Sequence, residues 1–253
     1  MTHTFCLLHG FGSSAQTFAP FKRALLRRWD RAVQPLEIIT PEFAGFGKRA
    51  NDPVSDDPFG TAIEDVVEAL RDKEKVTLIA HSMGGIPALH VASWFHSKYP
   101  GRLQNVVLIE GNLVAEDCGD IARRFRDAQS RSSLKNTRDN LGMSMLQKSE
   151  NSARHWGASL MNTQPETLQK YAGPLIDASE NGNLSLLFKG LQDSGLPMTY
   201  IHGDNKVGHP VLEALTGHSD VEYDTVHVAN AGHFVHEDQT QTFVDHVMER
   251  VAA

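Results

Sequence analysis

The chain has 253 residues, of which 40% are apolar and 22% are charged. This length suits one large domain or two small ones, and the composition excludes a disordered or fibrous protein. The net charge of −7 gives the chain no electrostatic reason to bind the phosphate backbone of a nucleic acid. Two cysteines, Cys6 and Cys118, are too few for a disulfide framework or a four-thiolate zinc site.

The N-terminal sequence carries no sign of a targeting segment. Its apolar stretch, Phe5 to Leu8, is too short for the hydrophobic part of a signal peptide and has no basic region before it. No run approaches the roughly 18 apolar residues that a membrane-spanning helix needs. We therefore expect a soluble, cytoplasmic protein with no membrane partner.

Six short apolar runs alternate with stretches of helical length in the outer parts of the chain. Runs that are apolar throughout are typical of strands buried on both faces of a parallel sheet. The runs are Phe5 to Leu8, Glu37 to Thr40, Val76 to Ala80, Val106 to Ile109, Met198 to Ile201 and Tyr223 to Val228.

Three further stretches have helical patterns. Residues 59–70 and 240–251 place apolar side chains on one helical face, whereas residues 85–95 are apolar nearly all round, which predicts a central helix. The alternation predicts a doubly wound α/β fold, with about six mostly parallel strands and helices on both faces of the sheet.

The alternation is interrupted over residues 113–195, which show several helical stretches but no strand signal. A structureless loop of that length is improbable in a compact domain. We expect a helical lid here, because long insertions at strand ends usually serve sites, and an α/β core made of residues 1–112 and 196–253. The alternative is a segment that only pads the fold.

The most informative motif is Ala80-His81-Ser82-Met83-Gly84, between a predicted strand and a predicted helix. Small residues two positions either side of Ser82 permit a tight turn that lifts the serine hydroxyl clear of the sheet. Ligands bind at the carboxyl ends of parallel strands, so Ser82 is a candidate nucleophile. The alternative is an ordinary serine in a strand–helix turn.

The loop after the first run, residues 9–12, reads His-Gly-Phe-Gly. An acyl-transfer site needs N–H donors where negative charge develops on the substrate oxygen, and the N–H groups of Phe11 and Met83 are candidates for this oxyanion hole. The glycines also fit a dinucleotide-binding loop, but the next run ends at Thr40 without the acidic residue that such a loop needs about 20 positions on.

Among thirteen histidines, His233 has a distinctive context, because it follows Gly232 just past the last run. A loop at this place can carry an imidazole over Ser82 as a general base, and the glycine gives that loop room. His236 is the competing candidate, one helical turn further on. A zinc site made of His233, His236 and Glu237 is disfavoured, because the spacing fits neither common zinc-binding helix.

Together these motifs resemble the α/β-hydrolase family, in particular its small, lidded serine esterases. The resemblance runs from His9 to the C-terminus except for the lid segment. It includes residues 41–47, which are similar to the family's Pro-Gly-x-Gly loop, and residues 201–204, Ile-His-Gly-Asp. It implies that the family's usual first two antiparallel strands are missing here. The motifs are specific for fold and poorly specific for substrate.

The resemblance leaves the acid of the catalytic triad to be found. In the family it usually stands three residues after the glycine that ends the penultimate strand, with a proline seven after that glycine. Gly203 and Pro210 keep this register, but Lys206 occupies the acid position. A lysine cannot accept the imidazole N–H. Asp204 lies where relatives often carry a structural aspartate.

A minority of the family, including some haloalkane dehalogenases, carries the acid after the preceding strand, where this chain has Glu110. A glutamate that ends a buried strand is costly unless a partner uses it. We therefore expect Glu110 to be the acid, with Asp204 as the alternative acid and a purely structural carboxylate as the other interpretation of Glu110. Dehalogenation is not expected, because those enzymes use an aspartate where this chain has Ser82.

Other residues are weaker candidates. The basic stretch of arginines at positions 123, 124, 126 and 131 is either a solvated helix face or a site for a carboxylate-bearing substrate. Trp156 is expected to pack or to contact the substrate. The residues expected to bind substrate are Gly10, His9, His81 and Trp156.

The sequence thus predicts a serine hydrolase for a small-molecule carboxylic ester, thioester or lactone. Ser82 attacks the carbonyl, His233 acts as base, Glu110 orients the imidazole, and water hydrolyses the acyl-enzyme. No metal or organic cofactor is implied. Alternatives on the same fold are a C–C bond hydrolase, a lyase and an acyltransferase. The alternative from another class is a ligand-binding protein with a vestigial triad.

Overall fold

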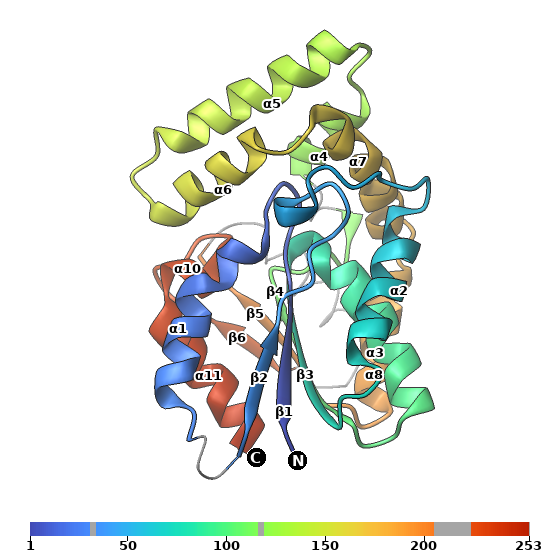
Figure 1. The fold of residues 1–253 in the computed structure, drawn as a ribbon, viewed down its shortest axis with the longest axis vertical. Helices are drawn as coiled ribbons and strands as arrows, with labels where there is room; N and C mark the ends of the chain where they lie inside the picture. Colours follow the sequence, from blue (N-terminus) through green and yellow to red (C-terminus); the bar gives the residue numbers. More distant parts are fainter. Residues whose placement is uncertain (31–33, 116–118, 205–223, 253) are drawn as a thin grey trace.

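The computed structural model describes residues 1–30, 34–115, 119–204 and 224–252 and contains one six-stranded sheet (Figure 1). The strand order is β2-β1-β3-β4-β5-β6, and every neighbouring pair is parallel, which confirms the predicted sheet. The strands are β1 His3–Leu8, β2 Leu36–Ile39, β3 Lys75–His81, β4 Leu103–Ile109, β5 Met198–His202 and β6 Thr225–His227.

Helices cover both faces of this sheet, as the doubly wound prediction requires (Figure 1). One face carries α1 (Ala19–Arg28), α10 (Val235–Asp238) and α11 (Thr240–Ala252). The other carries α2 (Pro58–Leu70), α3 (Gly85–Lys98) and α8 (Asn183–Asp193). Short 3₁₀ helices in the described connections include η1 Ala15–Phe18, η2 Gly47–Arg49 and η3 Ser82–Gly84.

Two apolar cores separate the sheet from its helices. Successive strand residues point to opposite faces, so Phe5 and Leu7 of β1 enter the core beneath α1 and α11, while Cys6 and Leu8 enter the core beneath α2 and α3. This explains why several strands are apolar at consecutive positions. The nearly uniform apolar pattern of α3 is explained by its central place, with α2 on one side and α8 on the other.

The sixth strand differs from its prediction. The run Tyr223 to Val228 was expected to form a strand, and within the described residues β6 is confined to Thr225–His227, with two of its three side chains exposed. The reason is its place at the edge of the sheet, where β5 is its one pairing partner. Tyr223 lies outside the described residues.

Helices also make up the segment between β4 and β5. They are α4 (Gly119–Arg126), α5 (Arg131–Leu146), α6 (Asn151–Met161), α7 (Pro165–Glu180) and α8. Figure 1 shows α4 to α7 over the carboxyl ends of the strands, whereas α8 packs against α3 in the layer beside the sheet. That residues 113–195 act as a lid stays a prediction. None of the helices in the described part of the chain is long and apolar enough to span a bilayer.

Candidate active site

Ser82 stands at the turn between β3 and α3, with a φ of +51°. This left-handed conformation costs a non-glycine residue about 1–3 kcal/mol, and such strain is concentrated at functional sites. The turn presses against the end of β1: a Cβ atom at Gly84 would lie 2.7 Å from the carbonyl oxygens of Leu8 and His9. The elbow that the sequence motif predicts is therefore present in its strained form.

Ser82 opens onto a cavity of about 350 Å³ between the sheet edge and the helices above it. The Ser82 hydroxyl lies 3.5 Å from the Oδ1 atom of Asn112. The cavity walls are mainly apolar, which suits an apolar ligand group beside one reactive centre. The lining residues are Phe11, His81, Ser82, Asn112, Asp120, Ile121, Ala122, Met145, Ala153, Trp156, Leu175, His233 and Phe234.

Glu110 ends β4 beside the elbow and is the second strained residue, with a φ of +48°. Its side chain is fully buried, and its Oε1 atom accepts a hydrogen bond from the Gly203 N–H at 2.8 Å. Its Oε2 atom faces His233 Nδ1 at 3.8 Å, longer than the predicted hydrogen bond. Neither of these two atoms has a hydrogen-bond partner elsewhere in the described part of the chain.

Asp204, the alternative acid, faces away from His233. Its two oxygens accept hydrogen bonds from the Asn230 N–H and from His227 Nε2, both at 2.7 Å. These bonds, the backbone one foremost, lower the pKa of Asp204, whose side chain is 52% exposed. Lys206 and Pro210, which set the expected acid register, lie outside the described residues.

The two competing histidines occupy different places. His233 lines the cavity, with its side chain 34% exposed. His236 is fully buried below it, where its Nε2 atom lies 2.8 Å from Thr17 Oγ1 and burial lowers its pKa to about 3. Of the two, the structure brings His233 to the cavity that holds Ser82.

His81 supports the loop that carries His233. Its Nε2 atom lies 2.9 Å from the His233 carbonyl oxygen, and its ring packs 4.7 Å from the His233 ring, centroid to centroid. Burial lowers the pKa of His81 well below the ordinary value, so the ring is neutral and Nε2 donates to that carbonyl. His81 also lines the cavity, as its predicted contact with substrate requires.

The loop after β1 abuts the elbow. A Cβ atom at Gly10 would lie 3.0 Å from the Cβ of Ser82, so only glycine fits without displacing the serine. Phe11 follows and lines the cavity, and its carbonyl oxygen accepts a hydrogen bond from Trp156 Nε1 at 2.8 Å. The oxyanion-hole role of the Phe11 and Met83 N–H groups stays a prediction.

His9, which the sequence analysis expects to contact substrate, lies away from the cavity in the structure. His9 is fully buried, it is not among the cavity-lining residues, and burial lowers its pKa to about 4. Its Nε2 atom accepts the Phe43 N–H at 3.2 Å, so the proton is on Nδ1, which donates to the Gly10 carbonyl at 2.9 Å. Both ring nitrogens bond to backbone, so His9 joins two loops instead of facing the cavity.

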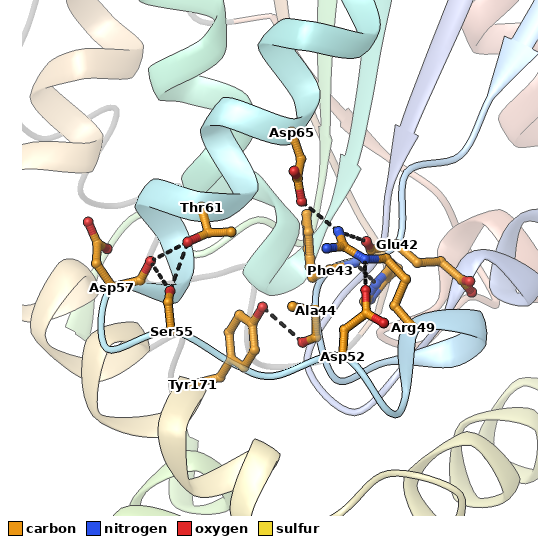
Figure 2. Close-up of polar contacts among 11 residues, drawn as sticks. Glu42, Phe43, Ala44, Arg49, Asp52, Ser55, Asp57, Thr61, Asp65 and Tyr171 are labelled. Atoms are coloured by element: carbon orange, nitrogen blue, oxygen red, sulfur yellow. Dashed lines mark hydrogen bonds and ion pairs between the residues drawn. The ribbon is translucent and has the colours of Figure 1, made fainter.

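Arg49 organises the loop that follows β2, which Figure 2 shows in detail. Its guanidinium donates to the Glu42 carbonyl and to the carboxylates of Asp52 and Asp65, and these carboxylates raise its pKa. Tyr171 of α7 donates its hydroxyl to the Ala44 carbonyl in the same loop. Tyr171 and Ala44 are 127 positions apart in the chain, so only the tertiary fold brings this tyrosine to the loop.

The basic stretch of the lid segment does not face the cavity. Each of its four arginines lies within ion-pair distance of a carboxylate, and none lines the cavity. This overturns the interpretation of these arginines as a site for a carboxylate-bearing substrate within the cavity. The pairs are Arg123 with Glu180, Arg124 with Asp120, Arg126 with Asp127 and Arg131 with Glu166.

The structure adds residues that sequence reasoning missed. Asn112 and Phe234 line the cavity beside the predicted triad, two positions after Glu110 and one after His233. Their place next to candidate residues is a signal that could have identified them. Met145 and Leu175 come from α5 and α7, and only the tertiary fold brings them there.

A model described as the alpha/beta hydrolase family matches residues 7–246. The chain belongs to the alpha/beta hydrolase family, as its motifs suggested.

Individual relatives include hydrolases of more than one kind. The chain is 28% identical to an sn-1-specific diacylglycerol lipase, ABHD11, of Xenopus laevis, over 94% of this chain and 76% of that protein. It is 27% identical to protein phosphatase methylesterase 1 of Schizosaccharomyces pombe, over 92% of this chain and 70% of that protein.

Solved structures share the fold at low identity. One, from a study of carboxylesterases of the thaumarchaeon Nitrososphaera gargenis, has a TM-score of 0.70 at 17% identity, and the match covers 99% of this chain and 90% of that chain. The esterase RhEst1 from Rhodococcus sp. ECU1013 has a TM-score of 0.67 at 14% identity, and the match covers 100% of this chain and 91% of that chain.

The close contact at Gly84 predicts that this position does not tolerate a larger residue. A methyl group there meets backbone carbonyl oxygens that cannot move without shifting β1, so we expect Gly84→Ala to destabilise the fold by about 1–3 kcal/mol or more. Urea unfolding measures the change. Gly190→Ala on α8 is the matched control, because its new methyl group meets nothing within 4 Å. Equal stability of the two variants would contradict the crowding at the elbow.

The buried histidines predict that the free energy of unfolding decreases as the pH falls. His9 and His236 have folded-state pKa values of about 4 and 3, below the ordinary 6.5, so the stability that they contribute as neutral groups is complete above about pH 6.5 and declines as the pH falls towards these values. Between pH 7.5 and 5.5 the two together remove about 2–3 kcal/mol from the free energy of unfolding.

Unfolding midpoints in urea at the two pH values measure this loss. His236→Gln should remove the share that His236 contributes, about 1–1.5 kcal/mol, because glutamine does not titrate. A His236→Gln protein with an unchanged pH dependence would refute the assignment.

Proposed function

We propose that the protein is a serine hydrolase that cleaves a carboxylic ester through an acyl-enzyme. The observation that carries the proposal is the paired strain at Ser82 and Glu110. Both are non-glycine residues with positive φ, at the ends of the adjacent strands β3 and β4. Ser82 lines the same cavity as His233, and Glu110 Oε2 lies 3.8 Å from His233 Nδ1. Backbone strain of this kind persists where function requires it.

In the proposed mechanism His233 takes the proton of the Ser82 hydroxyl as the serine oxygen attacks the ester carbonyl carbon. The N–H groups of Phe11 and Met83 stabilise the negative charge on the carbonyl oxygen. The imidazolium then protonates the leaving alcohol, and the acyl group stays on Ser82. A water molecule, deprotonated by His233, releases the acid.

Glu110 is the proposed third member of the triad. A buried carboxylate near His233 Nδ1 favours the tautomer with the proton on that nitrogen, and it stabilises the imidazolium when it forms. The 3.8 Å separation requires a shift of less than about 1 Å for a hydrogen bond, and apo active sites are often this loose.

The cavity supports a substrate with a neutral, apolar acyl group. Its walls include Phe11, Ile121 and Leu175, and none of its lining residues in the described part of the chain is a lysine or an arginine. Esters, thioesters and lactones with such groups all fit this chemistry. We further propose that α4 to α7, which supply Ile121, Met145, Trp156 and Leu175, act as a lid that sets the choice of acyl group.

Replacement of the nucleophile tests the proposal most directly. Ser82→Ala should lower kcat on a p-nitrophenyl ester by at least about 10³-fold with the fold retained, because the triad acts as a unit. Labelling with an alkyl phosphonate, followed by mass spectrometry, should place the adduct on Ser82. More than about a tenth of the original activity in Ser82→Ala would exclude this residue as the nucleophile.

A pair of carboxamide variants tests the acid. Glu110→Gln should lower kcat by about 10²–10⁴-fold, since an amide no longer stabilises the imidazolium, whereas Asp204→Asn, at an exposed site bonded to His227, should lower it much less. Both are isosteric, and circular dichroism checks that each variant folds. A larger loss in Asp204→Asn would reverse the assignment.

A further inference from the structure

Helix α6 bonds to both loops that carry the proposed catalytic groups. Ser152, His155 and Trp156 are spaced by three and four residues, so they share one face of the helix. Each of these side chains hydrogen-bonds to a residue outside the segment between β4 and β5. The three partners are Phe11, in the loop after β1, and Glu237 and Asp238, in α10.

Asp238, in α10, makes the most direct of these connections. Its Oδ1 atom accepts a hydrogen bond from the hydroxyl of Ser152, whose side chain is buried. Its Oδ2 atom accepts one from the Gly232 N–H at 2.8 Å. Gly232 immediately precedes His233, so one carboxylate joins α6 to the backbone that places the imidazole.

Two further bonds hold the same helix face. Glu237, with its side chain 4% exposed, accepts from Thr17 Oγ1 at 2.6 Å and faces His155 Nδ1 at 2.7 Å. Trp156 donates to the Phe11 carbonyl in the loop after β1. Helix α6 therefore bonds both to α10, which follows the histidine loop, and to the predicted oxyanion loop.

We propose that Asp238 is a positioning residue that couples the seating of α6 to the placement of His233. This inference rests on the proposed function and adds a residue outside the triad. While α6 is seated, Asp238 fixes the Gly232 N–H and with it the imidazole. When α6 lifts, Asp238 loses its Ser152 partner and the His233 loop loses its fixed place. Displacement of a catalytic group by about 1 Å can lower the rate about 10²-fold.

The test compares four variants on a p-nitrophenyl ester with a short acyl chain, with kcat expressed per active site titrated by an alkyl phosphonate. Asp238→Ala removes both hydrogen bonds, and we expect kcat to fall about 10–100-fold with KM within about 3-fold. Asp238→Asn should recover most of this loss, because its amide oxygen can accept the Gly232 N–H and its NH₂ group can donate to Ser152 Oγ.

The other two variants are a serine pair on α6. Ser152→Ala breaks the bond on the α6 side alone and should lower kcat about 3–10-fold. Ser159→Ala on the same helix is the matched control, and it should keep the original kcat. Ser152→Ala removes a single oxygen, so it keeps the test decisive if Asp238→Ala fails to fold.

Several results would overturn the inference. Unchanged kcat per titrated site in Asp238→Ala or Ser152→Ala would show that these residues affect only the folded fraction. Failure of Asp238→Asn to recover activity would exclude positioning through the two hydrogen bonds. Absence of a phosphonate adduct at Ser82 in the unaltered protein would overturn the proposed function and this inference with it, whereas an adduct with unchanged variant kcat would overturn the inference alone.

Discussion

The parallel pairing of β1 with β3 brings two chain segments so close that glycine alone fits at their contacts. Gly84 meets the carbonyl oxygens of Leu8 and His9, and Gly10 meets the side chain of Ser82. This contact forces the strained turn at the serine and holds the loop that carries Phe11 beside it. His9 then fixes the same loop to Phe43 from below. The rest of the site is arranged around this contact.

The second constraint on the site is that the buried side chain of Glu110 needs hydrogen-bond donors. Glu110 has a fully buried side chain, and a carboxylate removed from water needs compensating donors. The Gly203 N–H supplies one, and His233 Nδ1 lies 3.8 Å from the oxygen that is left. The proposed serine, acid and base thus come from three sheet connections that converge on one edge, which is the general property of parallel sheets.

The sequence predicted those parts that depend on neighbours along the chain. The strands, the elbow at Ser82 and the position of Glu110 at a strand end follow from local apolar patterns and small-residue spacing. The backbone bonds of His9 were not foreseen, because its partner Phe43 belongs to a distant loop. The bond between Ser152 and Asp238 was not foreseen, since residues 86 positions apart meet only through tertiary packing.

The segment of α4 to α8 leaves the sheet after β4 and returns at β5, and these two strands are paired neighbours. Because these strands are parallel, it leaves at the carboxyl end of β4, after Ile109, and returns at the amino end of β5, at Met198, which pairs with Val106. Both of its ends are therefore anchored in the sheet, whatever its internal sequence. One continuous stretch of the gene encodes more than half of the residues that line the cavity, and we expect its exchange to leave the sheet register unaltered. The fold thus allows the part of the cavity wall that α4 to α7 supply to change while the sheet and the residues at its edge stay the same.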